Sequence, residues 1–284
     1  MKIILLGATG AIGRLLTPRL VQAGHAVVGS TRSPDKFPAI AALGARPVAL
    51  NALDREGVFA LLRAERPAAV VNMLTDLAGL DLAANGRLRL EGSRHIADAA
   101  VAVGVSRLVA ESIAWMYAPG SGPAGEGEPL DVDAPEPRRR SVVAVRTLEN
   151  AVAELPLGVS LRFGILYGPG TWYARDGLMA EQAARGELAA DGDMSSFVHV
   201  DDAAGAAVDA LEWPTGAVNV CDDVPAAGHD WVPVFCRAVG ASDPAVITPA
   251  ERHGWARGAS NEHARKKLNW TPAYPSWREG FAHL

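Results

Sequence analysis

Residues 1–13 of the chain read Met1-Lys2-Ile3-Ile4-Leu5-Leu6-Gly7-Ala8-Thr9-Gly10-Ala11-Ile12-Gly13. The apolar run from residue 3 to residue 6 predicts a buried strand, and the pattern that continues to about Ala23 predicts a helix after it. Three glycines with GxxGxxG spacing separate the two elements, which allows a tight turn and a close approach of the backbone to a pyrophosphate. The helix would direct its free N-terminal amides at the phosphates. We therefore predict a dinucleotide site held by the backbone of Gly7, Thr9, Gly10, Ala11, Ile12 and Gly13.

Strand and helix patterns alternate through the first half of the chain. Strands are predicted at 26–30, 47–50, 69–72, 107–110 and 159–163, with the main helices at 88–103 and 142–155. This alternation is typical of a Rossmann-type α/β fold, a doubly wound parallel sheet with right-handed crossovers. After Gly164 helix patterns predominate, at 177–185, 201–211, 229–239 and 260–268. We predict a dinucleotide-binding domain over 1–165, with later returns at about 195–220, and a smaller, mostly helical substrate-binding part over 166–194 and 221–284.

Composition limits the class of protein. The 284 residues carry a formal net charge of −5, which argues against binding nucleic acid mainly through phosphate contacts. Two cysteines cannot form a disulfide framework, and the seven histidines lack the HxxH or HExxH spacing of metal sites. No apolar stretch reaches the roughly 18 to 20 residues that span a bilayer, and the first apolar run is too short for a secretory signal. We therefore expect a cytoplasmic protein, monomeric or homodimeric, that has a small-molecule substrate and no metal, membrane or nucleic-acid partner.

The end of the second predicted strand distinguishes the two nicotinamide cofactors. A carboxylate there would bind the ribose 2′-hydroxyl of NAD. The sequence instead reads Gly29-Ser30-Thr31-Arg32-Ser33, which contains no acidic residue and one arginine. A guanidinium can hold the 2′-phosphate of NADP with forked hydrogen bonds. We therefore predict NADP(H) rather than NAD(H), with a solvated Arg32 side chain as the alternative.

Several later motifs, together with the glycine turn, resemble those of the extended short-chain dehydrogenase/reductase superfamily, especially its atypical members. They are Asn51-Ala52-Leu53-Asp54, Glu91-Gly92-Ser93-Arg94, Tyr167-Gly168-Pro169-Gly170, Phe197-Val198-His199-Val200-Asp201-Asp202 and Leu268-Asn269-Trp270-Thr271-Pro272. The resemblance covers nearly the whole chain. It implies an NAD(P)H-dependent oxidoreductase, with Asn51, Ala52 and Phe163 as further cofactor-binding residues. Among atypical members, the chain is similar to angucyclinone ketoreductases of the simocyclinone type.

The family's catalytic positions are where this sequence departs from the pattern. Members use Tyr-x3-Lys on the helix before the sixth strand, where the lysine lowers the tyrosine pKa and the tyrosine exchanges a proton with the substrate oxygen. Here Ser141 stands at the tyrosine position and Val145 at the lysine position. The third family residue, a serine or threonine four places before Tyr117, is replaced by Ile113, with Ser112 one place earlier. The resemblance therefore implies that the usual triad is absent, and it leaves Ser112 and Tyr117 as secondary candidates for catalysis.

Two further charged residues are Arg89 and Glu111. Arg89 stands where the family often has asparagine. Glu111 lies near the end of a predicted strand, where it is either catalytic or simply buried with a partner.

Aromatic and sulfur side chains follow two of the predicted strands. Trp115, Met116 and Tyr117 come after the fifth strand, and Trp172 and Tyr173 come after the Gly-Pro-Gly turn. They would either line a flat substrate pocket or pack in the protein core. The segment from Ala118 to Arg140, which is rich in proline and glycine, is predicted to be a surface loop, with a mobile lid as the alternative.

These features together predict an NADPH-dependent ketoreductase. Its substrate would be a bulky aromatic secondary metabolite of the polyketide type, as in antibiotic biosynthesis. Hydride transfer would proceed without Tyr-Lys, because the substrate or water can supply the proton. The alternatives are a non-catalytic, NADP-sensing regulatory protein and an epimerase or dehydratase that recycles its cofactor.

Overall fold

The computed structural model describes residues 1–77, 81–246 and 252–284. Within them the chain folds as two compact units, each built from several segments. The first unit comprises Met1–Ser112, Val132–Leu161 and Ala204–Ala217. The second comprises Ile113–Asp131, Arg162–Ala203 and Val218–Leu284.

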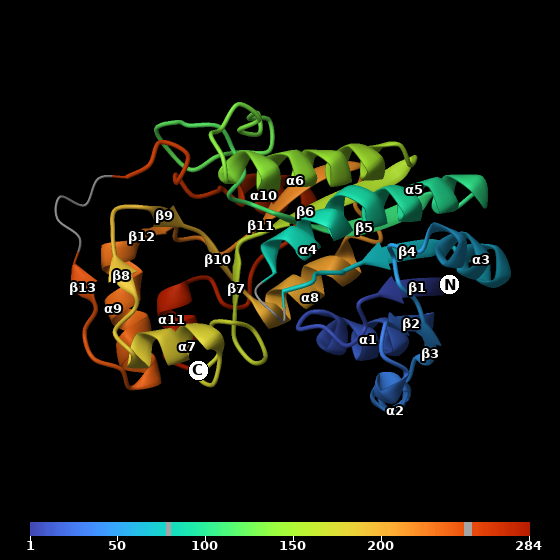
Figure 1. The fold of residues 1–284 in the computed structure, drawn as a ribbon, viewed down its shortest axis with the longest axis horizontal. Coiled ribbons are helices and arrows are strands. Elements are labelled where there is room, and N and C mark those ends of the chain that lie inside the picture. Colours follow the sequence, from blue (N-terminus) through green and yellow to red (C-terminus); the bar gives the residue numbers. More distant parts are fainter. Residues whose placement is uncertain (78–80, 247–251) are drawn as a thin grey trace. The chain divides into compact units, whose positions relative to one another are not determined.

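A seven-stranded sheet with flanking helices forms the predicted Rossmann-type fold (Figure 1). Its strands, in spatial order, are β11 (Gly216–Val220), β6 (Leu157–Phe163), β5 (Arg107–Ile113), β4 (Ala69–Asn72), β1 (Lys2–Leu6), β2 (Ala26–Thr31) and β3 (Arg46–Ala49). The pairings of β1 with β2 and β4, of β2 with β3 and of β4 with β5 are all parallel. The predicted fold class is thus confirmed. The strand order reverses between β1 and β4, and sheets of this kind bind ligands at the carboxyl ends of the strands beside such a reversal.

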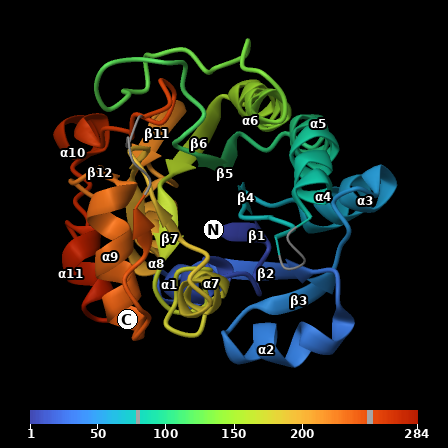
Figure 2. The same ribbon diagram turned by 60° about the vertical axis from the view of Figure 1, so that its left-hand side comes forward.

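Apolar helix faces cover the sheet of the first unit. Its helices are α1 (Gly13–Gln22), η1 (Pro34–Lys36), α2 (Phe37–Ala42), α3 (Arg55–Glu65), α4 (Leu82–Arg87), η2 (Leu88–Gly92), α5 (Ser93–Ala102) and α6 (Arg138–Ala153), followed later by α8 (Val200–Asp209), most of which belongs to this unit. Figures 1 and 2 show α5 and α6 side by side, and both pack against the same hydrophobic core. That core joins Ile4 and Leu108 of the strands to Val58, Ile96 and Leu148 of the helices.

Two helical segments differ from the expectation. The helix predicted from residue 88 is preceded by α4, and its first turn, η2, is π-helical. The helix predicted from residue 142 begins at Arg138, so the last residues of the proline-rich segment are helical. A π-turn adds one residue to a helix without interrupting its apolar pattern for long, so the sequence gives little sign of it.

The second unit combines the predicted helices with several short strands. It contains helices α7 (Leu178–Ala184), α9 (Gly228–Val239), α10 (Glu262–Leu268) and α11 (Trp277–Phe281) and short strands β7 (Ile165–Tyr167), β8 (Ala189–Ala190), β9 (Met194–Ser195), β10 (Phe197–His199), β12 (Ala226–Ala227) and β13 (Ala245–Val246). These strands pair two by two, β7 with β10, β9 with β12 and β8 with β13. Strands of two or three residues are too short to produce a recognisable alternation of polar and apolar residues. An aromatic core that includes Phe197, Trp231 and Phe281 holds the unit together.

The proline- and glycine-rich loop after Tyr117 is hydrogen-bonded within the second unit. The Ala124 amide donates to the Gly258 carbonyl over 3.0 Å. The Arg257 guanidinium, only 8% exposed, forms an ion pair with Glu128. These contacts favour the surface-loop interpretation for residues 118–131, and a lid stays a prediction.

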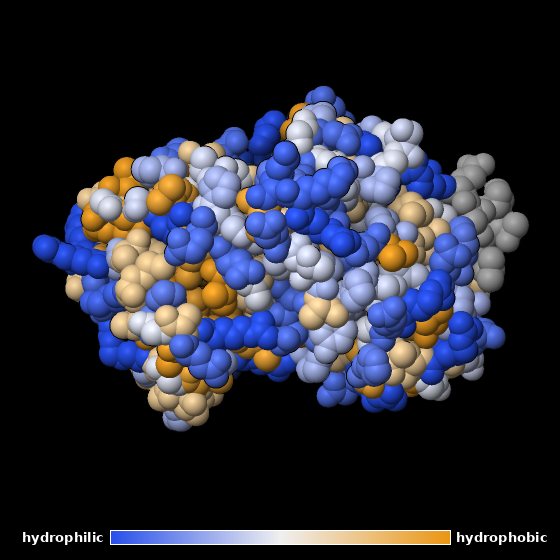
Figure 3. Space-filling view, turned by 180° about the vertical axis from the view of Figure 1, so that it is seen from behind, coloured by the Kyte–Doolittle hydropathy of each residue, from blue (hydrophilic) through white to orange (hydrophobic). Residues whose placement is uncertain are grey.

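In the part of the chain that the structure describes, no helix is both long and apolar enough to cross a membrane. Figure 3 shows that hydrophilic and hydrophobic residues alternate over small areas on one face of the molecule.

Candidate active site

The glycine turn after β1 has the geometry of a phosphate cradle. Gly7 has a φ of 85°, and a Cβ atom there would lie 2.6 Å from the Met73 carbonyl oxygen. A Cβ atom on Gly13 would lie 2.0 Å from the Gly7 carbonyl oxygen. Both positions therefore require glycine. Helix α1 begins directly after Ile12, with no side-chain cap and no acidic residue in its first turn, which leaves its N-terminal end suited to an anion.

A pocket of about 70 Å³ lies beside this turn in the same unit. It brings together three predicted cofactor residues from two different loops, Arg32, Asn51 and Ala52. The other lining residues are Leu50, Leu53, Leu74, Thr75, Asp76, Ala84, Arg87 and Leu88. The pocket combines apolar walls with a few polar groups at the edge of a Rossmann sheet.

Arg32 has a partner that the sequence did not indicate. Its Nη1 and Nη2 atoms donate to the two carboxylate oxygens of Asp76 over 2.7 and 3.1 Å. The arginine is 59% exposed and the aspartate 26%. Hydrogen bonding from Arg32 lowers the pKa of Asp76, which keeps the carboxylate charged. Because 44 residues separate the pair, no local pattern could have revealed it, although Asp76 does follow the predicted strand at 69–72 closely.

The two positions expected for tyrosine and lysine lie one turn apart on α6. Ser141 is partly buried and Val145 is fully buried. An unassisted serine is a poor acid at neutral pH, and valine carries no charge. The α6 sequence contains no lysine and no tyrosine at all. The helix therefore cannot supply a Tyr-Lys pair.

Ser112 and Ile113 end β5 without supplying a free hydroxyl. The Ser112 side chain is fully buried, and its Oγ donates to Glu149 Oε1 of α6 over 2.7 Å. This bond connects the sheet to the covering helix, so the serine already has a structural role. Ile113 is 7% exposed and apolar.

Tyr117 is enclosed in the second unit. Its hydroxyl donates to Asn219 Oδ1 over 2.6 Å and accepts from Arg162 Nη1 over 2.7 Å. The Arg162 guanidinium also lies 4.9 Å from the centre of the ring. Burial raises the pKa of Tyr117 to about 12. These contacts make the phenol a poor proton donor and favour a structural role over the catalytic one.

The other predicted pocket residues also belong to the second unit and differ in exposure. Tyr173 makes edge-to-face contacts with three aromatic rings, at centroid distances between 5.3 and 5.9 Å, so it packs in the core. Met116 is buried, Trp172 is partly buried and Trp115 is 37% exposed. Phe163, predicted to contact the cofactor, is buried in this unit too. Trp115 and Trp172 retain accessible surface without the dense ring packing of Tyr173, so these two could still contact a flat ligand.

A charged pair near the carboxyl end of β5 adds to the site. Arg89, on the π-turn η2, is 9% exposed, and Glu111 is partly buried. Burial lowers the pKa of the Arg89 guanidinium and raises the pKa of the Glu111 carboxyl, and each group opposes the shift of the other. The two side chains therefore interact electrostatically inside the first unit.

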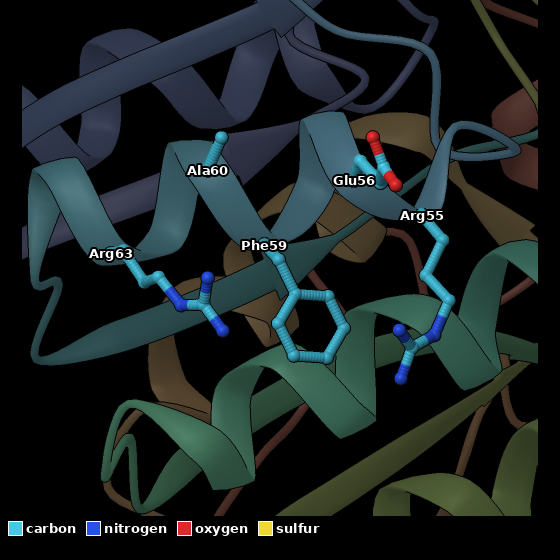
Figure 4. Close-up of a pocket in the computed structure, with 5 residues that line it drawn as sticks. All are labelled: Arg55, Glu56, Phe59, Ala60 and Arg63. Atoms are coloured by element: carbon cyan, nitrogen blue, oxygen red, sulfur yellow. The ribbon is translucent and has the colours of Figure 1, made fainter.

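A second hollow lies along α3 (Figure 4). Arg55 and Arg63 flank the Phe59 ring there, with guanidinium carbons 4.5 and 5.4 Å from its centroid. Such cation–π contacts stabilise the surface of a helix. None of the predicted site residues lines this hollow. Within the described residues, no group of three or more His, Cys, Asp or Glu side chains is placed to hold a metal ion.

Comparison with known proteins agrees with the fold and the glycine cradle. Residues 3–221 match the model of the NAD dependent epimerase/dehydratase family. The chain is 43% identical to a 3-diazoavenalumate denitrifying reductase from Streptomyces sp, over 99% of each protein. Among solved structures it is similar to UDP-glucose 4-epimerase from Thermotoga maritima with UDP-glucose, at 20% identity and a TM-score of 0.78 over 99% of this chain and 96% of that one.

A second solved structure has a similar fold. It is the UDP-glucose 4-epimerase of Thermus thermophilus in complex with NAD, at 22% identity and a TM-score of 0.77, covering 99% of this chain and 97% of that one. At this identity the likeness concerns the fold alone. The family match and the 43% identical reductase carry the assignment. The chain therefore belongs to the NAD-dependent epimerase/dehydratase family of extended short-chain dehydrogenase/reductases, and it is an NAD(P)-dependent oxidoreductase.

Proposed function

We propose that this protein is an NADPH-dependent reductase that transfers hydride to an electrophilic carbon of an aromatic substrate without a Tyr-Lys proton relay. The observation that carries the proposal is the replacement of that pair by Ser141 and Val145 on α6. A reductase with no proton donor on this helix is best suited to a substrate that needs none from it.

The cradle and the pocket beside it fit a dinucleotide. The backbone around Gly7, Gly10 and Gly13 would hold the pyrophosphate, and the small pocket that includes Ala52 would contact part of the adenosine. Arg32 is the residue that would bind a 2′-phosphate, which favours NADPH over NADH. When bound, the nicotinamide supplies the hydride, and the protein supplies orientation and exclusion of water.

The first candidate substrate is an aryl diazo compound. The Streptomyces relative is named as a denitrifying reductase of a diazo compound. In such a reaction hydride adds to the carbon that bears the diazonium group, a C–H bond forms, and the C–N bond breaks. The C–N electron pair leaves with dinitrogen, so an aryl diazonium ion and NADPH give the arene, dinitrogen and NADP⁺. No alkoxide forms at the reacting carbon, so the absence of tyrosine and lysine has no cost for this chemistry.

The second candidate is a ketone of a hydroxylated aromatic polyketide, of the angucycline type. A phenol next to the carbonyl would stabilise the oxyanion, and the proton would come from the substrate or from water. Trp115 and Trp172 favour a flat ring system, because both retain accessible surface. The two candidates share the cofactor and differ in the bond that the hydride replaces.

One experiment tests both candidates. The protein is incubated with NADPH deuterated at C4, separately on each face, and with a 2-hydroxyaryl diazonium salt or a panel of hydroxylated aromatic ketones. Reductive denitrification predicts deuterium on the ring carbon that lost nitrogen, with one dinitrogen released per NADPH consumed. Ketone reduction predicts deuterium on the carbinol carbon instead.

Two variants provide the controls for this assay. Gly13→Val should abolish transfer, because its side chain would fill the turn that any cofactor needs. Ser141→Tyr combined with Val145→Lys should bring no large gain. The proposal fails if NADPH binds but no deuterium reaches either product class, or if only the double variant transfers it.

A further inference from the structure

The π-turn η2 carries a buried arginine. Arg89 is only 9% exposed, and the described residues offer its guanidinium no hydrogen bond and no carboxylate within ion-pair distance. Its one resolved charge interaction is with Glu111. The Arg89 nitrogens are not among the fully enclosed, unpartnered polar atoms of the described residues, so the guanidinium reaches solvent and can receive a ligand there. π-turns occur frequently at functional sites. The placement therefore indicates a group kept for a ligand.

The strand register places Glu111 level with the glycine turn after β1. Leu6 of β1 is paired with Asn72 of β4, and Asn72 is paired with Ala110 of β5. Glu111 therefore stands at the same height as Gly7, one residue past the paired ends, and two strand spacings, about 10 Å, to the side. This is the carboxyl edge of the sheet, where ligands of such folds bind.

The π-turn also packs against the helix that lacks the family's lysine. η2 contacts α6, and Val145 of α6 is fully buried and uncharged. A cation from the π-turn is therefore available to the part of the sheet edge from which the α6 cation is missing.

We propose that Arg89, with Glu111 as its counter-charge, binds an anionic oxygen on the aromatic ring of the substrate. The inference rests on the proposed function and deepens it, since it names the substrate class as aryl compounds with an ionised oxygen beside the reacting carbon. In a 2-hydroxyaryl diazonium compound the oxygen bears negative charge that is shared with the diazo group. A guanidinium bound to that oxygen withdraws electron density from the ring, so the diazo carbon becomes a better hydride acceptor.

Holding the phenolate on Arg89 does not change the atom and electron balance of the denitrification step. Hydride replaces dinitrogen, the phenolate oxygen remains on Arg89, and it takes a proton from solvent when the product leaves. In a ketone the same guanidinium would hold the oxyanion of the product. Lysine would hold an oxygen as a point charge, whereas arginine offers a planar fork of donors.

Glu111 tunes the charge that Arg89 presents. Burial favours the neutral form of the Glu111 carboxyl, and the opposing charge of Arg89 favours the carboxylate. A charged Glu111 carboxylate would repel an incoming phenolate through its negative charge. Replacing Glu111 by glutamine should therefore strengthen binding of an anionic ring.

The test uses the full-length protein with NADP⁺ bound and 4-nitrophenol as a probe, because its phenolate absorbs visible light and its phenol does not. Wild type should bind the probe and shift its bound form to the phenolate at a pH near the free probe's pKa. Arg89→Gln should weaken binding about 10- to 100-fold and abolish the shift, since a charge-assisted hydrogen bond is lost. Arg89→Lys should retain the shift in part, and Glu111→Gln should strengthen it.

Arg140→Gln is the matched control, because Arg140 is an arginine of the same unit that is 82% exposed and paired with Glu136. It should bind the probe as wild type does. Thermal unfolding of each variant separates loss of binding from loss of folding. The inference is overturned if wild type does not bind the phenolate, or if Arg89→Gln, still folded, shows the wild-type spectrum.

Deuteride transfer, measured in parallel, reports on the proposed function separately. If binding of the 4-nitrophenolate probe depends on Arg89 but no deuteride is transferred, the proposed function is refuted and the anion site is supported. If Arg89→Gln transfers deuteride as fast as wild type to both hydroxylated and unsubstituted aryl diazonium salts, the proposed function holds and the anion site at Arg89 is refuted.

Discussion

Replacing Arg32 by alanine should weaken the binding of NADPH and leave the binding of NADH nearly unchanged. In the structure the guanidinium is engaged by both carboxylate oxygens of Asp76, over 2.7 and 3.1 Å. Binding of a 2′-phosphate therefore requires Arg32 to exchange one anion for another. Replacing Asp76 by asparagine should have the opposite effect, because it releases the guanidinium and removes a negative charge beside the phosphate.

The magnitudes follow from the exposure of the pair. At 59% and 26% exposure, the ion pair between Arg32 and Asp76 is worth about 0.2–1 kcal/mol, because solvent screens it. A hydrogen bond to a charged group contributes about 1.5–3 kcal/mol. The difference, about 1–2 kcal/mol, is the net contribution of Arg32 to NADPH binding. Arg32→Ala should therefore raise the Kd of NADPH about 5- to 30-fold. Asp76→Asn should lower that Kd by up to about fivefold.

Isothermal titration of both cofactors into wild type and each variant gives the four constants needed. Lys36→Ala is the matched control, since it removes a nearby exposed cation and should alter both cofactors slightly and equally. Equal weakening of NADPH and NADH by Arg32→Ala would refute the reasoning, because it would mean that the guanidinium stacks on the adenine instead. An unchanged NADPH constant in Asp76→Asn would show that the ion pair does not compete with the phosphate.

Three further predictions concern the glycine turn of the first unit and two buried polar residues of the second. Gly13→Ala should lower the free energy of unfolding by about 1–3 kcal/mol and abolish cofactor binding, because its Cβ atom would lie 2.0 Å from the Gly7 carbonyl oxygen. Gly122→Ala, whose Cβ atom would meet nothing within 4 Å, should change neither the free energy of unfolding measured in urea nor cofactor binding measured by titration. Burial raises the pKa of Asp222 to about 8. The folded state therefore holds a proton that the unfolded chain loses near pH 4, so the free energy of unfolding should fall as pH rises from about 4 to 8. Asp222→Asn should flatten that slope in urea unfolding at pH 5 and pH 8, and an unchanged slope would contradict the assignment. Tyr117→Phe should lower stability by about 1–3 kcal/mol, because two buried partners lose their hydrogen bonds, with the rate of deuteride transfer unchanged per folded molecule. A large loss of rate at full stability would instead make the phenol catalytic.

The sheet and the glycine turn after β1 could be predicted because their signals are local. A strand that is buried on both faces reads as a continuous apolar run, as residues 3–6 do. The glycine spacing reports steric needs within one turn, and the contacts at Gly7 and Gly13 arise from that turn and its neighbouring strand. Both features depend on residues close together in the sequence or on burial alone.

The partners of the candidate site residues could not be predicted, because they come from distant segments. Arg32 meets a carboxylate 44 residues away, and the Tyr117 hydroxyl donates to Asn219, 102 residues away. Burial also fails to distinguish a pocket wall from a core residue, since both are aromatic and enclosed. Tyr173 illustrates this, because its three ring contacts account for its position without any ligand.

Two departures from the family pattern, one on α6 and one on η2, are better understood together than separately. Val145 removes a cation from α6, and Arg89 adds one on η2, where the family often has asparagine. Since η2 packs against α6, the two changes concern one neighbourhood of the fold and leave its number of positive charges the same. A lysine on α6 acts with a tyrosine to move a proton, whereas an arginine can only hold an anion, because its pKa keeps it charged. The exchange therefore fits an enzyme whose site has given up proton transfer and kept the capacity to stabilise negative charge on its substrate.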